Sequence, residues 1–203
     1  MENVTMVEPI DAARVLLTRL LDAATDDYEA QTALRRLYRL VIEESMARIN
    51  AAWFCGLLLP TADSNPLSVC GVACGRDADI MLQVLQELEP NVSFCATHIS
   101  GEREWRLEHS SSFTASDMKC VVVMPICYDA DELSRVIEKL TIDGVSPFSI
   151  CVACVGFVHS VAHWIQSSYP GVNVVAVTSG DVDDNVLDDL ARRIRRTSSP
   201  RRC

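Results

Sequence analysis

Three carboxylates stand close together in the sequence, at Asp129, Asp131 and Glu132. This spacing has two interpretations. Asp129 could be the N-cap of a helix, with Glu132 completing a capping box and all three acids in or before the first turn. The three side chains could also hold a metal ion, but the sequence shows no second group of ligands. We therefore favour the structural role, a helix N-terminus.

Two cysteines and two histidines, Cys151, Cys154, His159 and His163, have a spacing that suggests zinc. A zinc knuckle needs its cysteines in a turn, and a zinc finger needs a longer gap before the histidines. Here both cysteines fall in an apolar run that predicts a strand, where residues three apart face opposite sides of the sheet. A redox-active pair is also disfavoured, because it would open a helix. We interpret both as buried thiols.

Six arginines and no acid lie between residues 191 and 203. Within this segment Ser198 follows Arg195-Arg196-Thr197, and Ser199 precedes Pro200, so both serines resemble phosphorylation sites. A phosphate there would neutralise part of the arginine patch. We expect a solvated, disordered tail, and contact with an anionic membrane, nucleic acid or the acidic body of the protein stays open.

The composition describes a globular chain of 203 residues with net charge −10 and 49% hydrophobic residues. That content excludes global disorder, and no apolar run reaches the about 18 residues of a membrane span. The nine cysteines, mostly in apolar stretches, and an N-terminus unlike a signal peptide predict the cytoplasm, with the nucleus as an alternative. Before residue 191 there are 12 basic and 28 acidic residues, a net charge of −16, which argues against nucleic acid except through the tail.

Short apolar runs alternate with helix-like segments along most of the chain. Two amphipathic segments open the sequence and predict helices, with Thr25 or Asp26 as the cap of the second. The apolar runs are 53–59, 67–73, 92–96, 120–127, 149–155 and 172–177, and the helical segments between them are 78–89, 130–142, 158–168 and 184–196. This alternation predicts a parallel sheet covered on both faces, with 105–113 as an antiparallel excursion. Ligands of such a sheet bind beyond the carboxyl ends of the strands, so we expect a site among loops 74–79, 98–103, 125–132, 156–159 and 178–184.

Residues 12–190 resemble the uracil phosphoribosyltransferase family in the order and spacing of several segments. Val69–Met81 resembles the family's GVSILRAGxxM loop, with Arg76 at the motif arginine. Val121–Glu132 resembles its VVDPMLATGGS phosphoribosyl-pyrophosphate loop, anchored on Pro125, and Tyr169–Val172 resembles its HPDV segment. The N-terminal helices follow its helical signature through Leu17–Leu21, Thr25, Leu37, Leu40 and Glu44, and Asp143-Gly144-Val145 follows at the family's spacing.

The resemblance implies an α/β fold, a type I phosphoribosyltransferase-like parallel sheet of about five strands, with helices on both faces and the N-terminal helices alongside. It also implies transfer of ribose phosphate from phosphoribosyl pyrophosphate to uracil, with magnesium. By resemblance, Arg76 and Arg103 belong to loops that contact pyrophosphate. The residues of the phosphate loop are Pro125, Asp129, Ala130, Asp131 and Glu132.

Two segments that contact the substrates in the family, the phosphate loop and the uracil-binding flap, differ in this sequence from the family pattern. Met124 stands in place of the acid that binds the ribose hydroxyls, and the family's Thr-Gly-Gly-Ser reads Asp129–Glu132. Two unit charges about 4 Å apart at an effective dielectric of about 20 interact by about 4 kcal/mol, whereas a helix N-terminus returns about 0.3–2 kcal/mol to an anion. Repulsion therefore exceeds attraction for a phosphate. The uracil-reading flap near the C-terminus is missing, and Gly156–His159 replaces the family's PEG turn.

These observations predict a uracil phosphoribosyltransferase-like domain over residues 1–190 and an arginine-rich, disordered tail over 191–203. The favoured function is a catalytically degenerate homologue: a pseudoenzyme, regulatory subunit or ligand-binding protein of pyrimidine (UMP) salvage, with no catalytic residue assigned. The alternatives are an active, divergent enzyme that makes UMP and an unrelated α/β binding module. Expected partners are a second copy or an intact homologue, and a nucleotide or nucleobase as ligand. No cofactor is expected, and Mg²⁺ only if the family activity is retained.

Overall fold

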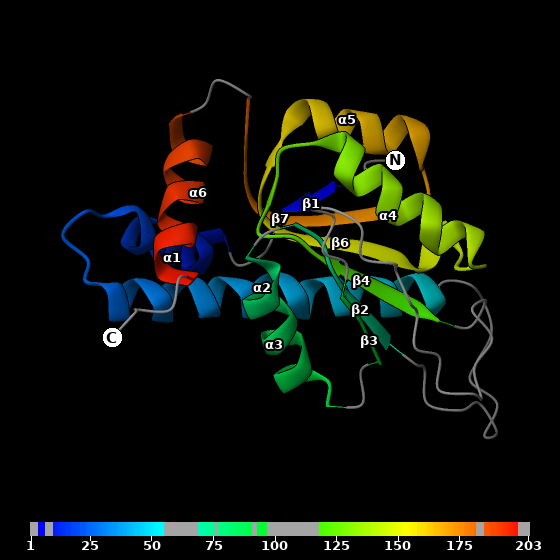
Figure 1. The fold of residues 1–203 in the computed structure, drawn as a ribbon, viewed down its shortest axis with the longest axis horizontal. Coiled ribbons are helices and arrows are strands. Elements are labelled where there is room, and N and C mark those ends of the chain that lie inside the picture. Colours follow the sequence, from blue (N-terminus) through cyan, green and yellow to red (C-terminus); the bar gives the residue numbers. More distant parts are fainter. Residues whose placement is uncertain are drawn as a thin grey trace.

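The protein is described by a computed structural model that places residues 4–6, 10–54, 69–75, 77–90, 93–96, 118–181 and 185–198. Within these residues seven strands form one sheet in the order β1-β7-β6-β4-β2-β3, with β5 also paired to β6 (Figure 1). All pairs are parallel. The strands are β1 (Val4–Met6), β2 (Val69–Ala73), β3 (Ser93–Ala96), β4 (Lys119–Val123), β5 (Ile126–Cys127), β6 (Ile150–Val158) and β7 (Asn173–Gly180).

Five of the strands, β2, β3, β4, β6 and β7, overlap the predicted apolar runs, so the predicted parallel sheet is confirmed. Strands β6 and β7 each extend three residues beyond the predicted run. The run 120–127 divides into β4 and β5, because Pro125 has no N–H and cannot continue a ladder. The carbonyl of Pro125 instead accepts from the N–H of Val155 at 2.9 Å. The edge strand β1 has three residues, too few for a recognisable period, and was not predicted.

Helices cover both faces of the sheet (Figure 1). They are α1 (Ile10–Leu21), α2 (Asp27–Phe54), α3 (Ala78–Leu88), α4 (Ala130–Ile142), α5 (His159–Ser168) and α6 (Asn185–Ser198), with a short 3₁₀ turn, η2 (Pro147–Ser149). Side chains alternate between two cores: Val121 and Val123 pack with α1, α2 and α3, whereas Cys120 and Val122 pack with α4 and α5. The predicted helices on both faces, with the N-terminal pair alongside, are thus confirmed.

Helix boundaries follow local chemistry. The carboxylate of Asp26 accepts from the N–H of Glu29 at 2.8 Å, which caps α2 as expected. The predicted strand at 53–59 is wrong at its start, because Trp53 and Phe54 form the last turn of α2. Alanines before Trp53 favour continuation of the helix. Residues 55–59 and the predicted excursion at 105–113 lie outside the described residues.

The arginine-rich segment is helical as far as the structure describes it. Residues 191–198 form the second half of α6, and the side chains of Ile194 and Thr197 are buried. The expected disordered tail is therefore wrong for these residues, because Leu187, Leu190 and Ile194 make one apolar stripe that packs on the body. Residues 199–203 lie outside the described residues. No helix in the described part of the chain is long and apolar enough to cross a membrane.

Candidate functional site

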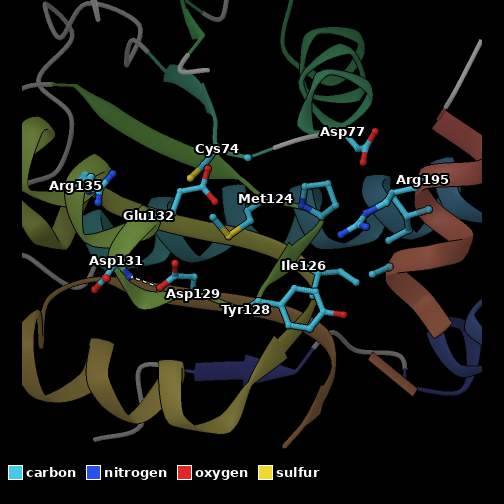
Figure 2. Close-up of a pocket in the computed structure, with 14 residues that line it drawn as sticks. Cys74, Asp77, Met124, Ile126, Tyr128, Asp129, Asp131, Glu132, Arg135 and Arg195 are labelled. Carbon is cyan, nitrogen blue, oxygen red and sulfur yellow. Dashed lines mark hydrogen bonds between the residues drawn. The ribbon is translucent and has the colours of Figure 1, made fainter. Parts of the chain in front are cut away.

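A pocket of about 440 Å³ opens at the carboxyl ends of β2 and β4 (Figure 2). One wall is the turn between β2 and α3, with Cys74, Gly75 and Asp77. The floor and a second wall come from Met124 through the first turn of α4, and the third wall is α6. Of the loops expected to form a site, 74–79 and 125–132 meet here. Loops 156–159 and 178–184 are partly strand, since β6 continues to Val158 and β7 to Gly180.

Asp129 occupies the N-terminus of α4. Its carboxylate accepts a hydrogen bond from the backbone N–H of Asp131 at 2.8 Å, and its own backbone is extended. The predicted N-cap is thereby confirmed. Ala130 is the first residue of the helix, and Asp131, in the first turn, faces the pocket from its rim. One of the backbone donors that a phosphate would use at this helix end is already bonded to a carboxylate.

Glu132 does not close a capping box but reaches across to the turn after β2. A β-carbon built on Gly75 would lie 3.6 Å from the Oε2 atom of Glu132. Gly75 has a φ of +83°, a conformation that favours glycine. Asp77, two residues on, also has a positive φ, of +66°, at the start of α3. The turn after β2 therefore passes close to the carboxylate of Glu132.

The pocket is acidic at the α4 end. Four carboxylates line it, those of Asp77, Asp129, Asp131 and Glu132, against the two guanidinium groups of Arg135 and Arg195, so the described lining carries a net charge of −2. Burial, and then the charge of Asp129, raises the pKa of Glu132, while Arg135 opposes the shift. Figure 2 shows Arg135 beside the acids and Arg195 across the pocket near Asp77.

The thiols beside the pocket are protonated. Burial raises the pKa of Cys127 to about 12, and the charges of Glu132 and Asp129 add to the effect. Burial also raises the pKa of Cys74, which lines the pocket. A thiol is nucleophilic only as its thiolate, so neither cysteine is suited to covalent catalysis.

Cys151 and Cys154 are fully buried and belong to the two opposite cores, as predicted from their spacing in a strand. Within the described residues, no group of three or more histidine, cysteine, aspartate or glutamate side chains is arranged to hold a metal ion. The burial of both side chains confirms the prediction that Cys151 and Cys154 are buried thiols.

Three contacts hold α6 against the body beside the pocket. The hydroxyl of Tyr128 donates to the carbonyl of Leu187 at 2.6 Å. Arg193 donates from Nε to the carbonyl of Leu20 at 3.1 Å and from Nη2 to that of Thr25 at 2.5 Å. Gly156 of β6 leaves room for the side chain of Leu187, since a β-carbon there would lie 2.9 Å from Leu187 Cδ2.

Sequence reasoning missed the residues that α6 and α4 bring to the pocket: Arg135, Ile194 and Arg195. The apolar stripe of 184–196 was the signal that the arginine segment continues a packed helix. Other predicted site residues are not brought together here. Arg76, Arg103 and Ser199 lie outside the described residues. Ser198 ends α6, and among the described residues its buried hydroxyl has no hydrogen-bond partner.

Comparison with known proteins finds no matching family model and no matching curated protein. Among solved structures, the AQ2163 protein from Aquifex aeolicus aligns over 88% of each chain with 11% identity and a TM-score of 0.60. An adenine phosphoribosyl transferase from Trypanosoma brucei, in complex with AMP, pyrophosphate and ribose-5-phosphate, aligns over 91% of this chain and 88% of that chain, with 12% identity and a TM-score of 0.54. The chain has the type I phosphoribosyltransferase fold. At this identity the likeness concerns the fold, and it does not distinguish a uracil-specific family.

Within the phosphoribosyltransferase fold, the segment 121–132 is a strand, a loop and a helix N-terminus at the carboxyl edge of the sheet. Such a helix end attracts anions through its free N–H groups and its dipole. In this chain the same end carries the carboxylates of Asp129, Asp131 and Glu132, whose negative charges oppose that attraction.

Proposed function

We propose that the protein is a catalytically degenerate phosphoribosyltransferase homologue, a pseudoenzyme that serves pyrimidine (UMP) salvage as a regulatory subunit or ligand-binding protein. The carboxylate of Asp129, bonded to the N–H of Asp131 at the start of α4, is the observation that carries the proposal. This hydrogen bond occupies a backbone N–H that a ribose 5-phosphate would need, and the negative charge of Asp129 opposes the charge of the phosphate.

The charge balance supports this conclusion. Each carboxylate about 4 Å from a phosphate charge costs about 4 kcal/mol at an effective dielectric of about 20, and the helix dipole returns at most about 2 kcal/mol. Within the described residues, the carboxylates form no group arranged to hold a metal ion by themselves. We therefore assign no step to a magnesium ion in this pocket.

The sequence resemblance adds the uracil and UMP context, and the intact sheet supports a role as a partner. We expect either a homodimer or a complex with an intact homologue. Co-expression with an active uracil phosphoribosyltransferase, followed by size-exclusion chromatography, tests the second arrangement. Elution of two separate species at micromolar concentrations would contradict it.

The enzymatic assay combines uracil, phosphoribosyl pyrophosphate and Mg²⁺ and follows UMP, with calorimetric titration of phosphoribosyl pyrophosphate in parallel. We expect no UMP and no binding. A variant with Asp129→Thr, Ala130→Gly, Asp131→Gly and Glu132→Ser restores the family's loop and is expected to bind phosphoribosyl pyrophosphate. UMP formation by the unchanged protein that Arg76→Ala abolishes would overturn the proposal.

An active, divergent enzyme is the second candidate, favoured by one observation. Arg135 and Arg195 line the pocket, and guanidinium groups recognise phosphate with two parallel hydrogen bonds. Under this alternative, Arg135→Ala and Arg195→Ala would each lower the affinity for phosphoribosyl pyrophosphate. If the unchanged protein shows neither binding nor turnover, this candidate is excluded.

A further inference from the structure

A second pocket, of about 420 Å³, lies between α1 and α2, and its described lining shares no residue with that of the pocket at α4. The two helices follow one another in the chain and pack side by side (Figure 1). Helix α1 contributes Leu16 and Arg19, and the first three turns of α2 contribute further residues from Tyr28 to Arg36. The volume lies in the range of small-molecule sites.

The pocket is lined by two guanidinium groups, those of Arg19 and Arg36. In the described part of the chain, neither side chain makes a hydrogen bond or an ion pair, whereas the three other arginines of α2 are each paired with a glutamate. The sequence explains the difference for Arg36, because no acidic residue lies three or four positions from it on the helix. Both guanidinium groups therefore keep their donors for a ligand.

The charge of the pocket favours an anion. Glu29 is the acid of the described lining, so the two guanidinium groups leave a net charge of +1. Two acids of the turn before α2, Asp22 and Asp26, accept hydrogen bonds from backbone N–H groups. Distant acids of the chain are largely screened, because the Debye length is about 8 Å at physiological salt. The pocket thus has the opposite sign to the whole chain, whose net charge is −10.

Apolar side chains make up another part of the lining. Leu16 and Ala33 supply aliphatic atoms from the two helices. Tyr28 is 77% exposed although its side chain is large and aromatic, so its ring is open to contact with a ligand. A ligand that carries a ring and an anionic group would use both parts of the lining.

We propose that this pocket binds a phosphate monoester of a small ring-bearing molecule, with the phosphate between Arg19 and Arg36 and the ring against Tyr28 and Leu16. A phosphate monoester carries about 1.5 to 2 negative charges at pH 7, which matches two guanidinium groups. Each guanidinium can donate two parallel hydrogen bonds to the phosphate oxygens. The site goes beyond the proposed function, and it does not depend on whether the pocket at α4 takes phosphoribosyl pyrophosphate.

The test is calorimetric titration of the full chain with phenyl phosphate at pH 7.5 in 0.15 M NaCl. Benzylammonium keeps the ring and reverses the charge, whereas inorganic phosphate keeps the charge and lacks the ring. We expect saturable, one-to-one binding of phenyl phosphate and no binding of benzylammonium. Inorganic phosphate should bind at least about threefold more weakly than phenyl phosphate, because it buries no apolar surface.

Variants of the lining locate the binding. Arg19→Gln and Arg36→Gln should each weaken phenyl phosphate binding at least about fivefold, because each removes a charge-assisted contact. Arg48→Gln is the matched control, since it makes the same change of charge on α2 about 18 Å along the helix axis from Arg36, and it should alter affinity less than about twofold. Glu29→Gln should strengthen binding, because it removes the negative charge of the described lining.

Four results would overturn the phosphate site. These are the absence of saturable binding of phenyl phosphate, equal binding of benzylammonium, equal losses in the Arg36→Gln and Arg48→Gln variants, and a loss in an Arg195→Gln variant without one in Arg36→Gln. The last result would place the ligand in the pocket at α4. Equal affinity for inorganic phosphate would overturn the contact assigned to Tyr28. Thermal unfolding without ligand confirms that each variant folds, and UMP formation tests the proposed function separately.

Discussion

The packing of α6 on β6 can be tested by a double-mutant cycle between Gly156 and Leu187. A β-carbon on Gly156 would lie 2.9 Å from Leu187 Cδ2, which is closer than ordinary contact, and 3.4 Å from Leu190 Cδ2, which is at the lower limit of ordinary contact. Gly156→Ala therefore forces α6 outward or its leucines into other rotamers, which costs about 1–3 kcal/mol of unfolding free energy. Leu187 is 1% exposed, and Leu187→Ala alone should cost about 2–5 kcal/mol.

The effects of the two substitutions on the unfolding free energy should not be additive. Once Leu187 is shortened, the added methyl group of Gly156→Ala has space, so the double variant should be at least about 1 kcal/mol more stable than the sum of the single effects predicts. Urea unfolding followed by circular dichroism gives the three free-energy differences. Leu85→Ala in α3, which packs near β2 and β4, is the control and should be additive with Gly156→Ala within about 0.5 kcal/mol. Additive effects for Gly156 and Leu187 would show that α6 does not pack as described.

Three further predictions concern single residues. Arg193→Ala, which removes hydrogen bonds to the carbonyls of Leu20 and Thr25, should lower the unfolding free energy by about 2 kcal/mol, whereas Arg192→Ala, in an exposed pair, should change it by less than about 1 kcal/mol. Asp129→Ala removes the cap of α4 and should cost about 1 kcal/mol in urea unfolding, with Asp129→Asn much milder. The folded-state pKa of Glu132 is raised, so the unchanged protein loses stability as the pH rises through that value. The Glu132→Gln variant should therefore have a higher unfolding free energy than the unchanged protein at pH 7, and this difference should disappear below the ordinary carboxyl pKa of about 4.3. Melting temperatures of the two proteins that change in parallel with pH would contradict this prediction.

The sheet was predictable because its strands are buried on both faces. Strands such as 120–123 and 150–158 are almost entirely apolar, and helix α4 was predicted with its actual bounds, 130–142. The secondary-structure predictions were wrong where an element depends on contacts with distant parts of the chain. Trp53 begins an apolar run that sequence alone cannot assign to strand or helix, and the preceding helix extends through it. The short strand β1 depends on pairing with β7 rather than on its own pattern.

The location of the pocket was predictable from the sequence, but the contacts within it were not. The loops at 74–79 and 125–132 and the cap at Asp129 follow from local rules, because strand ends and helix starts have sequence signatures. The reach of Glu132 toward Gly75 depends on the distance between two strands that are distant in sequence. The place of Arg195 depends on how α6 docks, which no local pattern specifies.

The acidic helix start and the arginine-rich helix are physically linked. Tyr128, between Ile126 of β5 and the cap Asp129, bonds to α6, and its raised pKa reflects burial and Asp188 opposed by Arg195 and Arg192. Positive charge from α6 thus acts on the same segment that carries the acids. Without α6, the carboxylates at the start of α4 would face one another with fewer opposing charges, and the pocket would lose a wall. Arg195 of α6 therefore contributes both to a wall of the pocket and to its charge balance.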